Sequence, residues 1–401
     1  MDKSVSKDAP PPFAPAEYAA RLQRLQGAIG AAGMEAVLLT TEAPFRYWAG
    51  FQTETWASPT RPRFLIVPRR GDPVAVVPTS NKPVMAAGPV RDIRAWQAPQ
   101  PEDEGVSVLV DALRERTGGT GVVGVEMGPE TRLGMPLADF FALRDRVAPI
   151  SFADAGPLLA AARRVKSPAE VARIRHVAQI VSTAFEALPG KVAGGMSERD
   201  IARRLQADIL MGGADKVQFM AVESGPAGYD RNITFASDRV LGAGDLLFID
   251  TGSTYDGYWC DFDRHVGFGR LPDEVHRAYA LVHRATDAGI EAVRPGLAMR
   301  DVWRAMAAVL EESGSVGSVV GRMGHGLGLL VTEPPSMSAT DETVLEPGMV
   351  ITIEPSIAYE TDDWRGGRAG KIMLHEENVV VTGDGCELLS RRAPPAIPMV
   401  A

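Results

Sequence analysis

The chain has 401 residues, which is longer than one hydrophobic core usually grows, so two domains are expected. Its apolar fraction of 45% and charged fraction of 23% are those of an ordinary globular protein. The formal net charge of −9 argues against a nucleic-acid partner or an anionic membrane surface. No apolar stretch approaches the ~18 residues that a membrane-spanning helix needs, so no membrane partner is expected either.

The cysteines and the N-terminal segment bear on the cellular compartment. Cys260 and Cys386 have no metal-binding spacing, which is typical of a reducing compartment and excludes a thiolate zinc site. Residues 1–14 are charged and Pro-rich and have no apolar core, unlike a signal peptide. We therefore expect a flexible arm at the N-terminus and a cytoplasmic protein.

Residues 15–160 alternate between helix and strand patterns. EYAARLQRLQGAIGAAG, VSVLVDALRERTGG and PLADFFALRDRV have helical periodicity, and the first ends at Gly33. EAVLLTT, RFLIVPRR, PVAVVPT and VVGVEM are typical of short strands. This alternation predicts an α/β domain of its own.

A second domain, residues 165–401, is predicted to begin with a long helix. Ser167 is a good N-cap, Pro168 suits the first helical position, and Glu170 completes a capping box. The apolar positions that follow lie on one helical stripe. They are Val171, Ile174, Val177, Ala178, Val181 and Phe185.

The second domain contains an internal repeat. GMSERDIARRL, from Gly195, matches GLAMRDVWRAM, from Gly296, and LGAGDLLFID matches LEPGMVITIE. Asp250 closes the first of these strands and Glu354 closes the second, 104 positions later. Chance similarity between Ala- and Gly-rich segments is the alternative. A duplication predicts two like halves about a pseudo-two-fold axis, with the two carboxylates brought together.

Two aspartates lie on a predicted hairpin, LLFIDTGSTYDGYWCDFDRHVGFG, whose Asp-Gly pair is a strong turn signal. We expect Asp250 and Asp261 to lie opposite each other on one face. Two adjacent buried carboxylates are costly unless a cation lies between them. Solvated edge residues are the alternative interpretation.

Three further segments carry candidate metal ligands. Glu354 ends an apolar strand, where an unpaired carboxylate would be costly. His325 lies between glycines, which allow the backbone to approach a site closely. In MLHEEN, spacing leaves open whether His375, Glu376 or Glu377 points inward. Carboxylates with one imidazole suit hard or borderline divalent ions.

These segments resemble the pita-bread metallopeptidase family, which includes Xaa-Pro dipeptidases, Xaa-Pro aminopeptidases, methionine aminopeptidases and creatinases. FIDTGSTYDGYWCD resembles the family's hairpin, GHGLGL its histidine loop, ITIEP its first glutamate strand and HEENVVVTGDG its second, which selects Glu376. RRVKSPAEVARIR and AVLLTTEAPFRYWAGF are similar to the inter-domain junction and the N-terminal domain of prolidases and creatinases. The implied fold is α+β, with a smaller α/β N-terminal domain before a C-terminal pita-bread domain that contains the pseudo-two-fold repeat.

The resemblance implies a dinuclear metal site. Asp250, Asp261 and Glu376 would hold one ion, and Asp261, His325, Glu354 and Glu376 the other. Mn²⁺ is the expected ion, with Fe²⁺, Co²⁺ and Zn²⁺ as alternatives. Glu354 would accept the proton of the attacking water.

The sequence departs from the family at two histidines. The first is absent before the hairpin, where Tyr229 and Arg231 are the candidate substitutes in substrate binding, and Arg231 also in catalysis. The second, a few residues after the histidine loop, is replaced by Thr332 as a candidate catalytic hydrogen-bond donor. Both losses favour a specialised substrate.

The N-terminal domain supplies further candidates. By resemblance to creatinases, the region of Trp56, Arg61 and Arg63 reaches the active site of the other subunit in a homodimer. Trp56 is expected to form an aromatic wall, and Arg61 or Arg63 to bind a substrate carboxylate. Arg63 as a residue flanking a strand is the alternative.

The sequence therefore predicts a dinuclear metal-dependent hydrolase of amide C–N bonds, acting on an Xaa-Pro dipeptide or a similar small molecule. One alternative is a creatinase-like non-peptidase hydrolase, or a lyase, acting on a small zwitterion. Another is a non-enzymatic binding module, which normally goes with eroded metal ligands.

Overall fold

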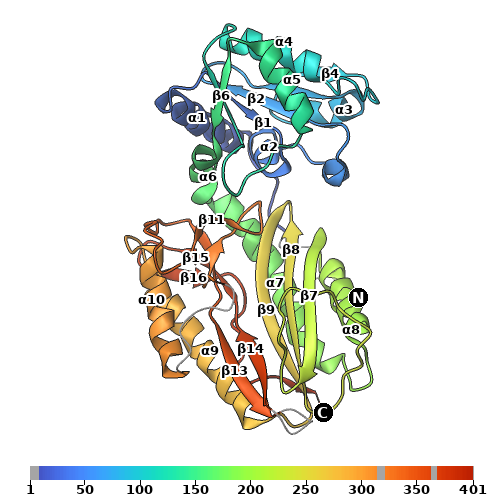
Figure 1. The fold of residues 1–401 in the computed structure, drawn as a ribbon, viewed down its shortest axis with the longest axis vertical. Coiled ribbons are helices and arrows are strands. Elements are labelled where there is room, and N and C mark those ends of the chain that lie inside the picture. Colours follow the sequence, from blue (N-terminus) through green and yellow to red (C-terminus); the bar gives the residue numbers. More distant parts are fainter. Residues whose placement is uncertain (1–8, 314–320, 363–367, 401) are drawn as a thin grey trace. The chain divides into compact units, whose positions relative to one another are not determined.

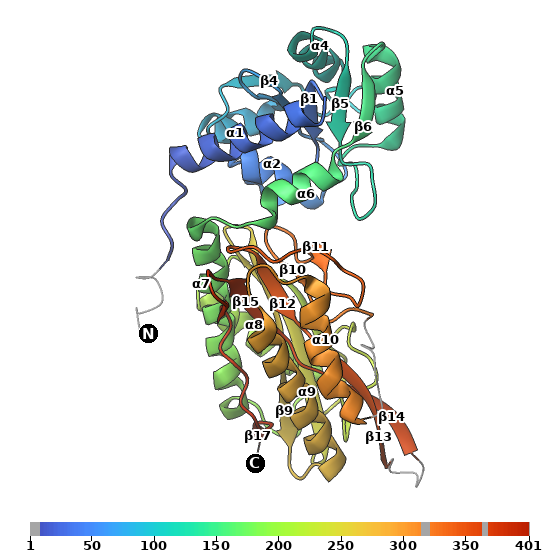
Figure 2. The ribbon, with the colours of Figure 1, turned by 90° about the vertical axis from the view of Figure 1, so that its left-hand side faces the viewer.

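The computed structural model describes residues 9–313, 321–362 and 368–400 (Figures 1 and 2). The described residues form two compact units, one of residues 12–163 and one of residues from 164 onward together with residues 9–11. Of the arm predicted at residues 1–14, residues 1–8 lie outside the described part. Helix α1 begins at Pro15, after extended backbone at Ala14.

The N-terminal unit contains a sheet with the strand order β4-β3-β2-β1-β5-β6. Strands β1, β2 and β3 are buried at every position, so they are covered on both faces. Helices α1 and α2 contact β2, and α4 also packs against β2. The bounds of the elements are α1 Pro15–Ala31, β1 Ala36–Leu39, α2 Glu42–Ala49, β2 Phe64–Pro68, β3 Val74–Pro78, α3 Lys82–Ala86, β4 Asp92–Trp96, α4 Val106–Thr117, β5 Val122–Val125, α5 Leu137–Val147, β6 Ser151–Asp154 and α6 Gly156–Arg164.

The helix and strand patterns of this unit are confirmed, but α2 was not predicted. Its sequence, EAPFRYWA, resembles a short strand or loop because it is aromatic and contains proline. Thr41 precedes it with extended backbone, and Gly50 ends it in the left-handed conformation at φ 64°. Proline is tolerated here because it lies in the first turn.

The C-terminal unit combines a four-stranded sheet (β17-β9-β8-β7), a five-stranded sheet (β11-β10-β12-β15-β16) and the pair β13-β14 among its described residues. Helix α7 packs on β8 and β9, and α9 and α10 run side by side (Figure 2). The bounds are α7 Pro168–Ala187, α8 Glu198–Met211, β7 Lys216–Pro226, β8 Asp245–Tyr255, β9 Tyr258–Phe268, α9 Asp273–Ala292, α10 Met299–Leu310, β10 His325–Gly326, β11 Glu333–Ser336, β12 Val350–Ile353, β13 Ser356–Asp362, β14 Arg368–Leu374, β15 Glu377–Val381, β16 Cys386–Leu388 and β17 Met399–Val400.

The capping box predicted at the start of α7 is present. The Ser167 hydroxyl accepts from the Glu170 N–H, and the Glu170 carboxylate accepts from the Ser167 N–H. None of the described helices is long and apolar enough to cross a bilayer.

The internal repeat is visible in the backbone. Helices α7 and α9 each have 20 residues, and each is followed by a shorter helix. An antiparallel bridge joins Ser197 to Val240 in the first half, and an equivalent one joins Ala298 to Val344 in the second. The two halves therefore repeat one arrangement of helices and strands.

The predicted hairpin is formed by β8 and β9, but its register differs from the expected one. Asp256 and Gly257 have φ values of 47° and 75°, as a type I′ turn requires. Asp250 pairs with Asp263, and Asp261 pairs with Gly252. Asp250 and Asp261 are thus diagonal neighbours on one face instead of direct partners. The reason is that the turn at Asp256 and Gly257 lies one residue beyond the midpoint between the two aspartates.

Candidate metal centre

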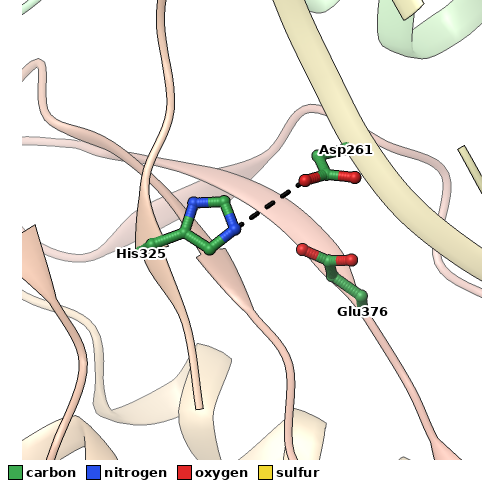
Figure 3. A group of neighbouring side chains, drawn as sticks. All are labelled: Asp261, His325 and Glu376. Atoms are coloured by element: carbon green, nitrogen blue, oxygen red, sulfur yellow. Dashed lines mark ion pairs between the residues drawn. The ribbon is translucent and has the colours of Figure 1, made fainter. Parts of the chain in front are cut away.

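Three candidate ligands from different strands and loops converge inside the C-terminal unit (Figure 3). One ligand atom of each of Asp261, His325 and Glu376 lies within 4.8 Å of the others. The His325 Nε2 atom is 3.7 Å from Asp261 Oδ2, and both carboxylates face the imidazole ring. All three residues are buried. The arrangement suits a cation because carboxylate and imidazole atoms point at a common position.

The glycines around His325 hold its backbone close to β12. Gly324 has a φ of 147°, and a Cβ there would lie 2.2 Å from the Thr352 carbonyl oxygen, so no other residue fits. His325 Nδ1 lies 2.9 Å from the Gly326 carbonyl oxygen. A carbonyl accepts only, so Nδ1 donates and the Nε2 lone pair faces Asp261. Burial lowers the pKa of His325 to about 4, which keeps the ring neutral.

Asp250 and Glu354 complete the acidic group. Burial raises the pKa of Asp250 to about 7, against a hydrogen bond with Asp261 that lowers it. Burial likewise raises the pKa of Glu354 to about 7, with Arg322 opposing and the charge of Asp250 adding to the rise. Burial, followed by the charges of Asp261, Glu354 and Asp250, holds the pKa of Glu376 well above its usual range. The four carboxylates therefore repel one another electrostatically.

The donor set fits divalent cations. Within the described part of the chain, Asp250 Oδ1, Asp261 Oδ1 and Glu376 Oε1 are buried and have no hydrogen-bond partner. A buried carboxylate oxygen without a partner costs several kcal/mol unless a proton or cation neutralises it. Oxygen ligands with one imidazole match Mn²⁺, Fe²⁺, Co²⁺ or Zn²⁺.

Metal affinity is expected to increase with pH. The raised pKa values mean that the folded, metal-free protein binds more protons than the unfolded chain, so its stability falls as pH rises from about 4 to about 7. Binding a cation displaces those protons, so the Kd for Mn²⁺ should fall about tenfold per pH unit for each proton released, up to about pH 7. Titration calorimetry in buffers of different ionisation enthalpy would count the protons. Unchanged affinity between pH 5 and 7 would contradict the expectation.

Two residues that were not predicted from the sequence fix the backbone near the candidate ligands. The Asn378 side chain accepts from the Asp261 N–H at 3.0 Å and donates to the Asp261 carbonyl oxygen. Glu333 accepts from the backbone N–H groups of Leu329 and Leu330 and forms a buried ion pair of 3.0 Å with Lys166. A glutamate between Thr332 and two prolines was the available signal for this role.

The structure distinguishes the three candidates in MLHEEN. Glu376 points toward Asp261 and His325 (Figure 3). Glu377 points away, into contacts with Arg264 and Arg392. His375 packs its ring against other aromatic rings. The geometry therefore agrees with the choice that the family resemblance implied.

Tyr229 and Arg231, the substitutes proposed for the first missing histidine, have other partners in the structure. Tyr229 is 1% exposed, and its hydroxyl bonds His265 Nε2 and the Leu374 N–H, so it is a core residue. The Arg231 side chain is 65% exposed and pairs with Glu223 at 2.7 Å.

Arg322 is a cation that the sequence interpretation overlooked. Its guanidinium donates to Glu354 Oε1 and to Thr332 Oγ1, both at 3.3 Å. Thr332 thus lies beside the acidic group, as expected. Its hydroxyl oxygen accepts from the arginine there, so its own O–H still has a proton to donate.

Trp56 and Arg63 contact each other within the N-terminal unit. The Arg63 guanidinium lies 5.0 Å from the centre of the Trp56 ring and bonds Asn81 and Thr55, and only 2% of the residue is exposed. Arg61 is exposed, with its backbone N–H bonded to Glu104. Of these candidates, Arg61 remains available to a ligand, while Arg63 is a structural residue beside β2.

Comparisons with known proteins identify the family of the chain. Residues 172–383 match the model of metallopeptidase family M24, and residues 21–165 match the creatinase/prolidase N-terminal domain. A probable dipeptidase PepE of Mycobacterium tuberculosis is 31% identical over 371 residues, which covers 92% of this chain and 95% of the relative. The crystal structure of dipeptidase PepE from Mycobacterium ulcerans has a TM-score of 0.81 at 29% identity, covering 97% of this chain and 99% of that one. A prolidase from Thermococcus sibiricus has a TM-score of 0.82 at 25% identity, covering 95% and 99%.

The family match covers more than half of the chain, and the relatives match it over nearly their whole length. The fold is the pita-bread fold of prolidases, preceded by the smaller N-terminal domain. The chain belongs to metallopeptidase family M24 and is a metallohydrolase.

Proposed function

We propose that this metallohydrolase uses two divalent ions to hydrolyse the amide bond of an Xaa-Pro dipeptide. The observation that carries the proposal is the convergence of Asp261, His325 and Glu376, with ligand atoms within 4.8 Å of one another, beside two further carboxylates. Relatives named dipeptidase and Xaa-Pro dipeptidase support the substrate class.

The residues would divide between the ions as the resemblance to the family implies. Asp250, Asp261 and Glu376 would hold one ion, and Asp261, His325, Glu354 and Glu376 the other, with Mn²⁺ the expected metal. When bound, such ions supply Lewis acidity and lower the pKa of a neighbouring water. Asp261 and Glu376 would bind both ions, so substitutions at these two residues should be the least tolerated.

Glu354 would move the proton in the reaction. Its carboxylate accepts a proton from water as the water oxygen bonds to the carbonyl carbon, and returns it to the nitrogen as the C–N bond breaks. Arg322, 3.3 Å from Glu354 Oε1, orients the carboxylate and stabilises its charged form. The Thr332 hydroxyl would donate a hydrogen bond to the substrate carbonyl oxygen.

Arg322 would take over the charge of the missing imidazoles. We expect Arg322→Met to lower kcat/KM by about 10- to 100-fold, because a guanidinium that bonds a developing oxyanion or a substrate carboxylate contributes a few kcal/mol. Steady-state kinetics of the purified variants measures this. Arg231→Met is the comparison variant. A larger loss of kcat/KM in Arg231→Met would assign this role to Arg231, as the sequence predicted.

A creatinase-like hydrolase, or a lyase, acting on a small zwitterion is the second candidate. A guanidinium and a hydroxyl beside the acidic group, in a chain without the two family histidines, favour it. A panel of Xaa-Pro dipeptides, creatine-like and ectoine-like compounds with added Mn²⁺ separates the two. Turnover of dipeptides supports the first, and turnover of the small zwitterions without any peptide cleavage replaces it with the second.

We also propose a cytoplasmic homodimer. The unpaired cysteines agree with a reducing compartment. The exposed Arg61 is available to complete the site of a partner subunit. Sedimentation of wild type and Arg61→Ala, together with their KM values, tests this. A monomer with an unchanged KM in the variant would refute it.

A further inference from the structure

Asp263 is a buried acid that neither the sequence interpretation nor the proposed function uses. It lies on β9, directly opposite Asp250 on β8. Paired residues on adjacent strands project from the same face, with Cβ atoms about 5 Å apart. The same face carries Asp261, two residues earlier on β9. Asp263 is therefore part of the acidic group.

The carboxylate of Asp263 has one satisfied and one unsatisfied oxygen. Oδ1 accepts from the backbone N–H of Glu376 at 3.2 Å. Oδ2 is buried and has no hydrogen-bond partner among the described residues, and Asp263 is 0% exposed. Asp250 Oδ1 and Glu376 Oε1 share this condition.

Arg264, the next residue in the chain, favours the charged form of Asp263 but directs its hydrogen bonds to other groups. Arg264 donates from Nη1 to the carbonyl oxygens of Asp263 and Glu376, and from Nη2 to the Glu377 carboxylate. Its hydrogen bonds therefore go to backbone carbonyls and to a different acid. On the other side, Asp263 borders the apolar core, because the next pair along the hairpin is Phe248 and His265. A bare carboxylate is costly there.

We propose that Asp263 is a fifth carboxylate of the metal centre, with Oδ2 a further oxygen ligand of the ion held by Asp250. This inference rests on the proposed dinuclear site. Oδ1, through the Glu376 N–H, also positions the backbone of a ligand that serves both ions. Asp263 thus closes the buried end of the site, where the hairpin passes into the core.

The test compares Mn²⁺ binding and thermal stability of wild type and Asp263→Asn. Asparagine keeps an oxygen for the Glu376 N–H and removes the charge. We expect wild type to bind two Mn²⁺ per chain by titration calorimetry and by mass spectrometry of bound metal. In the variant, one of the two ions should bind about 10- to 100-fold more weakly.

The melting temperatures provide a second readout that does not depend on activity. In EDTA, Asp263→Asn should melt at or above the wild-type temperature because one of several clustered like charges is gone. In Mn²⁺ it should melt below wild type. If Asp263 only accepts the Glu376 N–H, Asp263→Asn should melt at the wild-type temperature both in EDTA and in Mn²⁺. Asp263→Ser should then melt below wild type by the same amount in both conditions.

Asp245→Asn is the matched control, since Asp245 is a buried aspartate on the same hairpin whose carboxylate already pairs with Arg239 and the Gly242 N–H. It should leave both Mn²⁺ affinities unchanged. Two ions bound with wild-type affinity by Asp263→Asn and Asp263→Ser would overturn this inference and leave the proposed function intact. Failure of wild type to bind two ions would overturn both.

Discussion

Asparagine in place of Asp261 is expected to lower kcat/KM by at least about 1,000-fold, which corresponds to about 4 kcal/mol of transition-state stabilisation. Asp261 lies between Asp250 and His325 and is a candidate ligand of both ions, so the loss of its charge weakens both. The fold should survive, because Asn378 bonds the backbone of Asp261 and not its side chain.

Kinetics and metal content of Asp261→Asn, measured on the same preparation, check this result. Asp238→Asn is the control, since the Asp238 side chain is 83% exposed and pairs with Arg199 at the surface. Wild-type turnover by Asp261→Asn would remove Asp261, and with it the dinuclear site, from the mechanism.

The neighbouring glutamates of β15 and the loop before it are expected to respond in opposite ways. Glu377→Gln should lower the free energy of unfolding by about 3 to 5 kcal/mol, because it leaves the largely buried Arg264 without its charged partner and leaves Arg392 with Asp287 alone. Glu377 accepts hydrogen bonds from Arg264, Arg392, Ser390 and the Ala393 N–H, and is 0% exposed.

Glu376→Gln should instead keep or increase the stability of the metal-free protein while abolishing activity. Its Oε1 has no hydrogen-bond partner in the described structure, and its charge is repelled by four neighbouring carboxylates. Urea unfolding in EDTA and in Mn²⁺ measures both variants. Equal destabilisation of the metal-free protein by the two substitutions would show that the two glutamates have one structural role in common.

The local features of this fold were readable from the sequence. The cap formed by Ser167 and Glu170, the type I′ turn at Asp256 and Gly257, and the strand patterns of the first domain depend on neighbouring residues only. The internal repeat was also readable, because both halves preserve the same glycines and strand ends.

The register of the hairpin and the contacts of individual polar side chains could not be predicted from the sequence. A two-residue turn pairs Asp250 with Asp263, whereas the sequence interpretation paired Asp250 with Asp261. Tyr229 and Arg231 were chosen for their chemistry, and their positions depend on His265 and Glu223. Arg322 was not predicted because its contacts with Glu354 and Thr332 depend on how the loops fold together.

The duplicated architecture has a consequence for biosynthesis. Asp250 and Asp261 belong to the first half, and Glu354 and Glu376 to the second, so the acidic hairpin leaves the ribosome before the residues that would complete the proposed metal site. A nascent chain interrupted between the halves would lack the ligands of the second half. Under the proposed site, tight metal binding therefore requires translation to have passed Glu376.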